Sequence, residues 1–319
     1  MRFALPIFVL AGSVMAQPPA QPSAAQPVPP AQPAQVQVVP DRSAEADAFL
    51  GELESADKGL LRLVADVKYQ RSFELVGDRQ TRFGRLAYVA EPSDQADGKH
   101  DDKPTDNPSG RKFAVTFDRF EIGSEVRNEE KSYIFDGHWL VEKIPGEKLF
   151  KKHEVVPPGE RFDPLRIGQG PFPVPIGQRR ADIVARFEVD KLAAEAGLDA
   201  DDNTSETDAA AQRDFATGTT QIRLTPRPGT PEAEDFREVR LWYLRDASGR
   251  WLPRMAKTIN PAGDASLIFL INVRTLHSGQ QATTETEIPA AMLDTTTPEA
   301  GWDVSIQRWA GRAEPLGGP

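Results

Sequence analysis

The sequence predicts an α+β protein that is mainly antiparallel β-sheet. Aromatic and branched residues recur at strand spacing in three consecutive segments, residues 83–90, 111–120 and 132–144. The third segment holds Asp136-Gly137, a pair that suits a tight hairpin turn because its residues accept positive φ. These segments therefore predict an antiparallel meander in the first half of the chain.

Apolar residues occupy both sides of these predicted strands. Phe113, Val115 and Phe117 share one side of their strand, whereas Ile134 in the next strand lies opposite its neighbour Phe135. An antiparallel sheet with one face in water alternates more cleanly than this. The pattern therefore indicates either a sheet covered on both faces or a sheet curled around an apolar cavity.

The first residues are typical of an export signal that is removed from the mature protein. Arg2 supplies a basic start, and residues 3–15 form an apolar run that is too short to span a bilayer. Small or modest residues precede the predicted cleavage site after Ala16. The sequence contains no cysteine, which excludes disulfides, thiolate metal sites and a lipid-attachment cysteine, so we expect a soluble exported protein.

The rest of the chain is expected to be one domain behind a tether. Residues 17–40 are rich in Pro, Gln and Ala and show no periodicity, which predicts a disordered segment. The domain is expected over residues 41–309, with a C-terminal tail at 310–319. It opens on a predicted helix at 43–57, whose apolar residues fall at helical spacing, and a strand over about residues 61–75.

Two polar stretches, residues 91–110 and 197–213, are expected to be surface insertions in this domain. Between them, residues 179–196 carry apolar positions at helical spacing and predict a second helix. Further strands are expected at residues 220–226, 237–246, 251–259, 265–274 and 283–287, and a last segment at 300–307.

No catalytic, metal or cofactor site is singled out. The chain lacks a Gly-x-Ser-x-Gly elbow, and its 4 histidines are scattered. His100 stands beside Asp101 and Asp102, but within a polar insertion where a metal site is not expected. A glycosidase pair is not excluded by the number of carboxylates, yet no pair is singled out. We expect a protein that is not an enzyme and holds neither a metal nor a cofactor.

The net charge and the loop over residues 157–177 both indicate which kind of ligand to expect. A formal net charge of −10 argues against nucleic acid as a partner. Residues 157–177 are apolar but rich in Pro and Gly, which forbid a helix or a central strand. The apolar stretch 171–176 is interpreted either as ordinary core packed over the sheet or as a mobile lid over an apolar cavity.

Several short motifs recur in a characteristic order. In the first half they are Phe83-Gly-Arg-Leu86, Lys112-Phe113 and a strand ending Asp136-Gly-x-x-Leu-Val141. In the second half they are the segments 222–226, 236–242, 252–255, 260–268 and 298–304. In their order and spacing these motifs resemble the LolA-like family of periplasmic outer-membrane lipoprotein carriers, over most of residues 41–307.

The resemblance implies an incomplete antiparallel β-barrel of about eleven strands, with a helical or loop lid over an apolar cavity. It implies a periplasmic carrier that binds acyl chains of lipoproteins or other lipids and shuttles them toward the outer membrane. The implied partners are these acyl chains, an inner-membrane releasing transporter and an outer-membrane acceptor, and a monomer is expected. The residues expected to line the cavity and its lid are Leu63, Val67, Phe113, Val115, Phe117, Phe135, Phe172, Val174 and Ile176.

The chain departs from this family at the arginine that tethers the lid. Family members often place it just before the proline that opens the third strand, where this chain has Glu91 before Pro92. Arg111 or Lys112 is the candidate substitute. Two alternatives stay open: a lipid or lipoprotein sensor on the same fold, which would not release cargo at an acceptor membrane, and a secreted hydrolase with an unrecognised site, which would show turnover.

Overall fold

The computed structural model divides the chain into two compact units, Met1–Val39 and Pro40–Pro319, and describes residues of the second alone. The described residues are 42–75, 77–90, 110–155, 167, 172, 176–199 and 204–309. The expected signal, tether and tail, and nearly all of the first polar insertion, lie outside them. Among the described helices, none has the length and apolar character needed to cross a membrane.

Strands dominate the described residues, as the sequence predicts. The strands are β1 Leu60–Ser72, β2 Arg79–Ala90, β3 Arg111–Ile122, β4 Glu125–Phe135, β5 Trp139–Ile144, β6 Leu149–Glu154, β7 Phe187–Leu192, β8 Thr220–Pro226, β9 Glu238–Arg245, β10 Trp251–Ile259, β11 Ala265–His277 and β12 Asp303–Gln307. The helices are α1 Arg42–Ala56, α2 Arg180–Arg186, α3 Glu206–Ala216 and α4 Glu232–Asp235, with 3₁₀ turns η1 Pro145–Glu147, η2 Thr284–Thr286 and η3 Ala290–Leu293.

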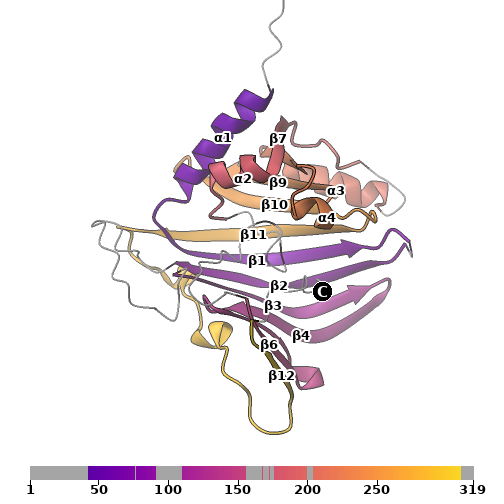
Figure 1. The fold of residues 1–319 in the computed structure, drawn as a ribbon, viewed down its shortest axis with the longest axis vertical. Coiled ribbons are helices and arrows are strands. Elements are labelled where there is room, and N and C mark those ends of the chain that lie inside the picture. Colours follow the sequence, from indigo (N-terminus) through magenta and orange to yellow (C-terminus); the bar gives the residue numbers. More distant parts are fainter. Residues whose placement is uncertain are drawn as a thin grey trace, which may run out of the picture. The chain divides into compact units, whose positions relative to one another are not determined.

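All of these strands belong to one 12-stranded sheet in the order β12-β6-β5-β4-β3-β2-β1-β11-β10-β9-β8-β7 (Figure 1). Neighbours are antiparallel except β12 and β6, which run parallel. Among the described residues no pairing joins β12 to β7, so the sheet is not closed into a barrel. The open, mainly antiparallel sheet agrees with the predicted fold class, with twelve strands where about eleven are expected.

The hairpin predicted at Asp136-Gly137 is confirmed, and its geometry explains the sequence. Gly137 has φ of 105°, which side chains rarely adopt. The carboxylate of Asp136 accepts the backbone N–H groups of His138 at 3.0 Å and Trp139 at 2.8 Å. Gly84 serves close packing instead, because a Cβ there would lie 1.9 Å from the carbonyl oxygen of Thr116 on the neighbouring strand.

Two predicted elements are wrong. The helix expected over 179–196 ends at Arg186, and Phe187–Leu192 forms the edge strand β7. Alternating charges within this segment allow a cross-strand ion pair, in which Asp190 accepts from Arg223 at 2.7 Å, and pairing with β8 outweighs the helical spacing. The strand expected at 283–287 is the 3₁₀ turn η2, closed by reciprocal hydrogen bonds between Thr283 and Thr286.

Both faces of the sheet are covered, which explains the two-sided apolar pattern. The inner face carries the largest apolar cluster, to which α1 contributes Phe49, Leu50 and Leu53. The outer face carries two smaller clusters. One packs Ala114, Ile134, Val141 and Phe150 against Met292, Leu293 and Trp302, and the other packs Trp242, Met255, Leu267 and Phe269 against Leu198, Phe215, Ala216 and Ile271.

The second segment expected to be a polar insertion contributes to this outer covering. Within and after 197–213, Ser205 caps α3 by accepting the N–H of Asp208 at 3.2 Å. Ala209 and Ala216 of that helix are fully buried.

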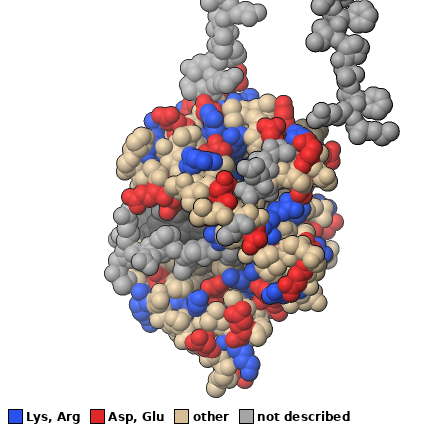
Figure 2. Space-filling model, turned by 90° about the vertical axis from the view of Figure 1, so that its right-hand side faces the viewer, with Lys and Arg blue, Asp and Glu red and all other residues tan. Residues whose placement is uncertain are grey.

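Elsewhere on the surface, acidic and basic side chains are intermixed, as the face in Figure 2 shows.

Candidate functional site

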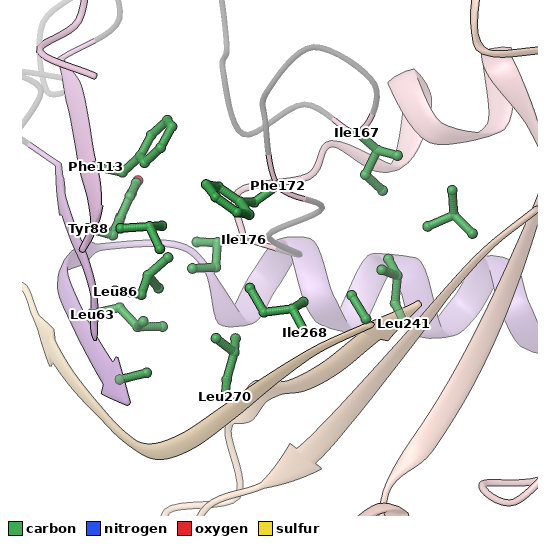
Figure 3. Close-up of a cluster of buried hydrophobic side chains, with 14 of the residues drawn as sticks. Leu63, Leu86, Tyr88, Phe113, Ile167, Phe172, Ile176, Leu241, Ile268 and Leu270 are labelled. Atoms are coloured by element: carbon green, nitrogen blue, oxygen red, sulfur yellow. The ribbon is translucent and has the colours of Figure 1, made fainter. Parts of the chain in front are cut away.

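Three side chains outside regular structure occupy the middle of the inner face. These are Ile167, Phe172 and Ile176, here called the plug residues, which are 1%, 4% and 0% exposed. All three belong to the inner cluster. Figure 3 shows Phe172 and Ile176 lying between Tyr88 and Leu86 on one side and Ile268 and Leu241 on the other, with Ile167 beyond them toward α2. The sheet therefore bends around the plug residues.

Phe172 makes the most specific of these contacts. Its ring meets those of Tyr69 and Tyr133 edge to face, with centroids 5.4 Å and 5.2 Å apart, and tilts against Phe117 at 5.8 Å. Edge-to-face pairs add about 0.5–1.5 kcal/mol beyond burial alone. A side chain from a non-repetitive segment thus fills an aromatic socket built by β1, β3 and β4.

One end of the plug is fixed at a half-buried carboxylate. The N–H of Gly177, the residue after Ile176, donates to Asp57 Oδ2 at 2.7 Å. Burial raises the pKa of Asp57 to about 6, while that hydrogen bond and the charge of Arg111 pull in the opposite direction. Gly177 has φ of +71°, and a Cβ there would lie 2.9 Å from the Arg111 guanidinium. Glycine therefore suits this position better than a residue with a larger side chain.

The other end is fixed at a buried arginine. Arg186 donates to the carbonyl oxygen of Ile167 at 2.9 Å and to Glu232 Oε1 at 2.8 Å. A further ion pair joins it to Asp182 at 2.7 Å. The side chains of Arg186 and Glu232 are only 8% and 7% exposed, so the guanidinium is held by several acceptors rather than by water.

The structure brings together eight of the nine residues predicted to line a cavity and lid. Val174 lies outside the described residues. Each of the others is buried in the inner cluster, and these are Leu63, Val67, Phe113, Val115, Phe117, Phe135, Phe172 and Ile176. That they contact a ligand stays a prediction. Of the two candidate tether residues, Arg111 lies beside Gly177, and Lys112 pairs with Val89 in the β2–β3 ladder.

Sequence reasoning missed two parts of this site. The first is α1, whose Phe49 ring packs edge to face on Tyr243 at 5.9 Å and on Trp251 at 4.9 Å. The second is the set of inner-face residues in the closing strands, which includes Leu241 and Ile268. Apolar residues fall on both faces of β9 and β11, as in the consecutive buried residues 267–270, so local pattern neither identifies the inner face nor shows that it meets β1–β4.

Within the described ranges no group of three or more His, Asp or Glu side chains is placed to hold a metal ion. The inner cluster offers contact with apolar groups, together with the hydroxyls of Tyr69, Tyr88, Tyr133 and Tyr243. Tyr69 donates to Ser266 at 3.1 Å, and Tyr133 donates to Glu142 at 3.3 Å.

No family model matches the sequence, and no curated protein is significantly similar to it. Solved structures are similar to it at the level of the fold. A candidate outer membrane lipoprotein-sorting protein domain from Vibrio parahaemolyticus has 11% identity and a TM-score of 0.35, over 75% of this chain and 95% of that one. A DUF1329 family protein from Desulfovibrio piger has 11% identity and a TM-score of 0.36, over 79% and 99%.

A LolA superfamily protein from Nitrosomonas europaea has 11% identity and a TM-score of 0.28, over 78% of this chain and 97% of that one. Proteins of the family that the sequence motifs resemble are thus among the structures similar to this chain.

Proposed function

We propose that this protein binds acyl chains on the inner face of its sheet, in the space that the plug residues occupy. The observation that carries the proposal is the aromatic socket around Phe172, a set of apolar walls filled by a side chain that belongs to no helix or strand. Such walls recognise a hydrocarbon chain as readily as a phenyl ring, since burial of apolar surface is not directional.

The burial energies permit an acyl chain to exchange with the plug residues. Burial of the three plug side chains contributes about 1.5–3 kcal/mol each, or roughly 5–9 kcal/mol together. A chain of about twelve carbons gains roughly 10 kcal/mol at about 0.8 kcal/mol per buried methylene. An acyl chain of ordinary length is therefore able to replace the plug residues, and a short chain is not.

The wider role that we propose is that of a periplasmic carrier for lipoproteins or other acylated molecules. Its support is the export-type N-terminus, the motif order that resembles the LolA-like carriers, and an inner face whose apolar residues come from both halves of the chain. An acylated protein needs such cover because its chains are not soluble in an aqueous compartment.

A chain-length series tests this proposal. The delipidated protein should increase the fluorescence of a solvatochromic fatty-acid probe, and saturated fatty acids should displace that probe. Affinity should rise by up to roughly fourfold per methylene, until the chain outgrows the site. A triacylated lipopeptide should compete as well.

Three other results would redirect the proposal. Absence of probe binding would refute acyl binding. Steady cleavage of a lipid ester would indicate the hydrolase instead. Tight binding without release to acceptor vesicles would favour the sensor over the carrier.

A further inference from the structure

The apolar inner face ends in a polar cavity at the β12 edge of the sheet. Strand register shows where the inner face changes from apolar to polar, because directly paired residues share a face. One row of paired residues runs Leu63, Tyr88, Phe113, Phe135, Leu140, His153 and Gln307, and the next runs Leu86, Val115, Tyr133, Glu142, Lys151 and Ser305. Each row is apolar or aromatic through β4 and becomes polar at β5 or β6.

The cavity lies where the rows change character. It has a volume of about 270 Å³ and is lined by Tyr133, Leu140, Glu142, Lys151, His153, Ser305 and Gln307. Pockets that hold a whole small molecule measure roughly 300–1,000 Å³. The cavity falls just below this range, so it has room for a head group but not for an entire lipid.

Tyr133 forms the wall between this cavity and the plug. Its ring packs against Phe172 with centroids 5.2 Å apart, while its hydroxyl donates to Glu142 at 3.3 Å. Burial and the neighbouring Glu142 charge raise the pKa of Tyr133, which keeps that hydroxyl protonated. Tyr133 thus contacts the position of Phe172 with its ring and lines the cavity as well.

The cavity is lined by one carboxylate, Glu142, and one lysine, Lys151, and the buried Lys131 beside Glu142 adds a second positive charge. Glu142 accepts from Lys131 at 2.8 Å, and Lys151 lies 3.6 Å from its other oxygen. Burial raises the pKa of Glu142, but the hydrogen bond and charge of Lys131 and the charge of Lys151 outweigh it and lower that pKa overall. One carboxylate thus faces two lysines. The Lys151 side chain is 42% exposed, and its longer contact leaves it available to a second acceptor.

We propose that this cavity binds the anionic head group, a phosphate or carboxylate, of a ligand whose acyl chain lies on the inner face. Lys151 supplies the main charge, and Ser305 and Gln307 on β12 supply neutral hydrogen-bonding groups. The inference rests on the proposed acyl binding, and it adds a preference among lipids that an apolar surface alone does not provide.

Three ligands with the same chain and different head groups test this preference. In this test the fluorescent acyl probe bound to the delipidated protein is titrated with decyl phosphate, 1-decanol or decyltrimethylammonium. We expect decyl phosphate to bind about tenfold more tightly than 1-decanol, and the cation to bind most weakly. Inorganic phosphate at the same concentration should leave the probe bound, because without a chain it gains only the exposed lysine contact.

Two substitutions with opposite expected effects on the ratio of phosphate to alcohol affinity make the test specific. Lys151→Met should reduce the ratio of phosphate to alcohol affinity about three- to tenfold, and Glu142→Gln should increase it. Lys152→Met is the matched control, because Lys152 is the next residue on β6, points to the outer face and donates to the carbonyl of Thr295 at 3.2 Å. It should leave the ratio unchanged.

The outcomes separate the two proposals. Equal displacement by all three ligands, or a ratio that responds alike to Lys151→Met and Lys152→Met, would overturn the head-group site and leave acyl binding intact. Displacement of the probe by inorganic phosphate alone would show an ion site unrelated to lipid. Failure of every chain-bearing ligand and of the probe to bind would overturn both.

Discussion

At the scale of single residues, one buried and one half-buried charged group fix the backbone around the plug residues. Asp57 accepts the N–H of Gly177, and Arg186 donates to the carbonyl oxygen of Ile167. Buried charges are costly unless they are hydrogen-bonded. Each of these charges meets that condition partly through main-chain groups next to the plug, so the position of the plug and the stability of the charges are linked.

The raised pKa of Asp57 predicts a particular dependence of stability on pH. The pKa is about 6 in the folded protein and about 3.9 in an unfolded chain, so between these values the folded state binds more protons. The free energy of unfolding should therefore fall as pH rises from about 4 to 6. The full shift corresponds to about 3 kcal/mol, and partial solvent contact of Asp57 reduces this to about 1–2 kcal/mol.

Chemical denaturation of the wild type and Asp57→Asn across this range measures the effect. The amide keeps an acceptor for Gly177 but does not titrate, so the variant should lose the decline between pH 4 and 6. The exposed Asp118→Asn serves as the control and should follow the wild type. Parallel curves for wild type and Asp57→Asn would show that this carboxylate is not the source.

At the scale of elements, the sequence predicts best where local pattern and tertiary pairing agree. Strands β8 and β10 have the predicted bounds, and α1 differs from its prediction by a single residue at each end. Strand β7 was missed because Phe187–Leu192 satisfies helical spacing and strand alternation at once, and only pairing with β8 decides between them. Strand β6 is short and mostly polar, so no pattern marks it.

The candidate site, too, is predicted where local pattern is sufficient and is missed where contacts distant in sequence decide. Strand alternation identifies inner-face residues such as Val115 and Phe117, because it depends only on neighbours in sequence. The contact between Gly177 and Asp57 spans 120 positions and joins a loop to the residue after α1. No local pattern encodes that contact. Its sequence signal is the apolar proline-rich stretch 171–176, whose structure was left open between packed core and lid.

Phe172 is predicted to oppose ligand binding because it fills the aromatic socket. Phe172→Ala removes one of the three buried side chains that a ligand must replace, so affinity for the fatty-acid probe should increase about tenfold or more. Leu75→Ala is the control, since Leu75 is 92% exposed and should not change affinity. Titration of the probe measures both. Unchanged or weaker binding by Phe172→Ala would mean that the ligand does not enter this socket.

At the scale of the whole described unit, the sheet is open in its pairing and is packed on both faces. The outer clusters cover one face, while the inner face surrounds three side chains that belong to no helix or strand. Removal of those side chains would expose apolar walls contributed by both halves of the chain. The claim that follows from this arrangement is that an acyl chain takes the place of the plug residues.

Cysteine accessibility tests that claim directly, because the sequence contains no cysteine. Ile176→Cys places a thiol at a position that is 0% exposed. The rate of its reaction with a maleimide should be low in the delipidated protein. Addition of a fatty acid of about twelve carbons, a length at which the energies balance, should increase that rate at least severalfold.

Two further single-cysteine variants complete the measurement. Leu75→Cys should react quickly with or without ligand, and Ala114→Cys, 0% exposed in an outer-face cluster, should stay slow in both conditions. We expect the ligand to raise the labelling rate at position 176 and at neither of the other two positions. If the ligand binds and position 176 stays as protected as position 114, the acyl chain does not replace the plug, and the central claim is contradicted.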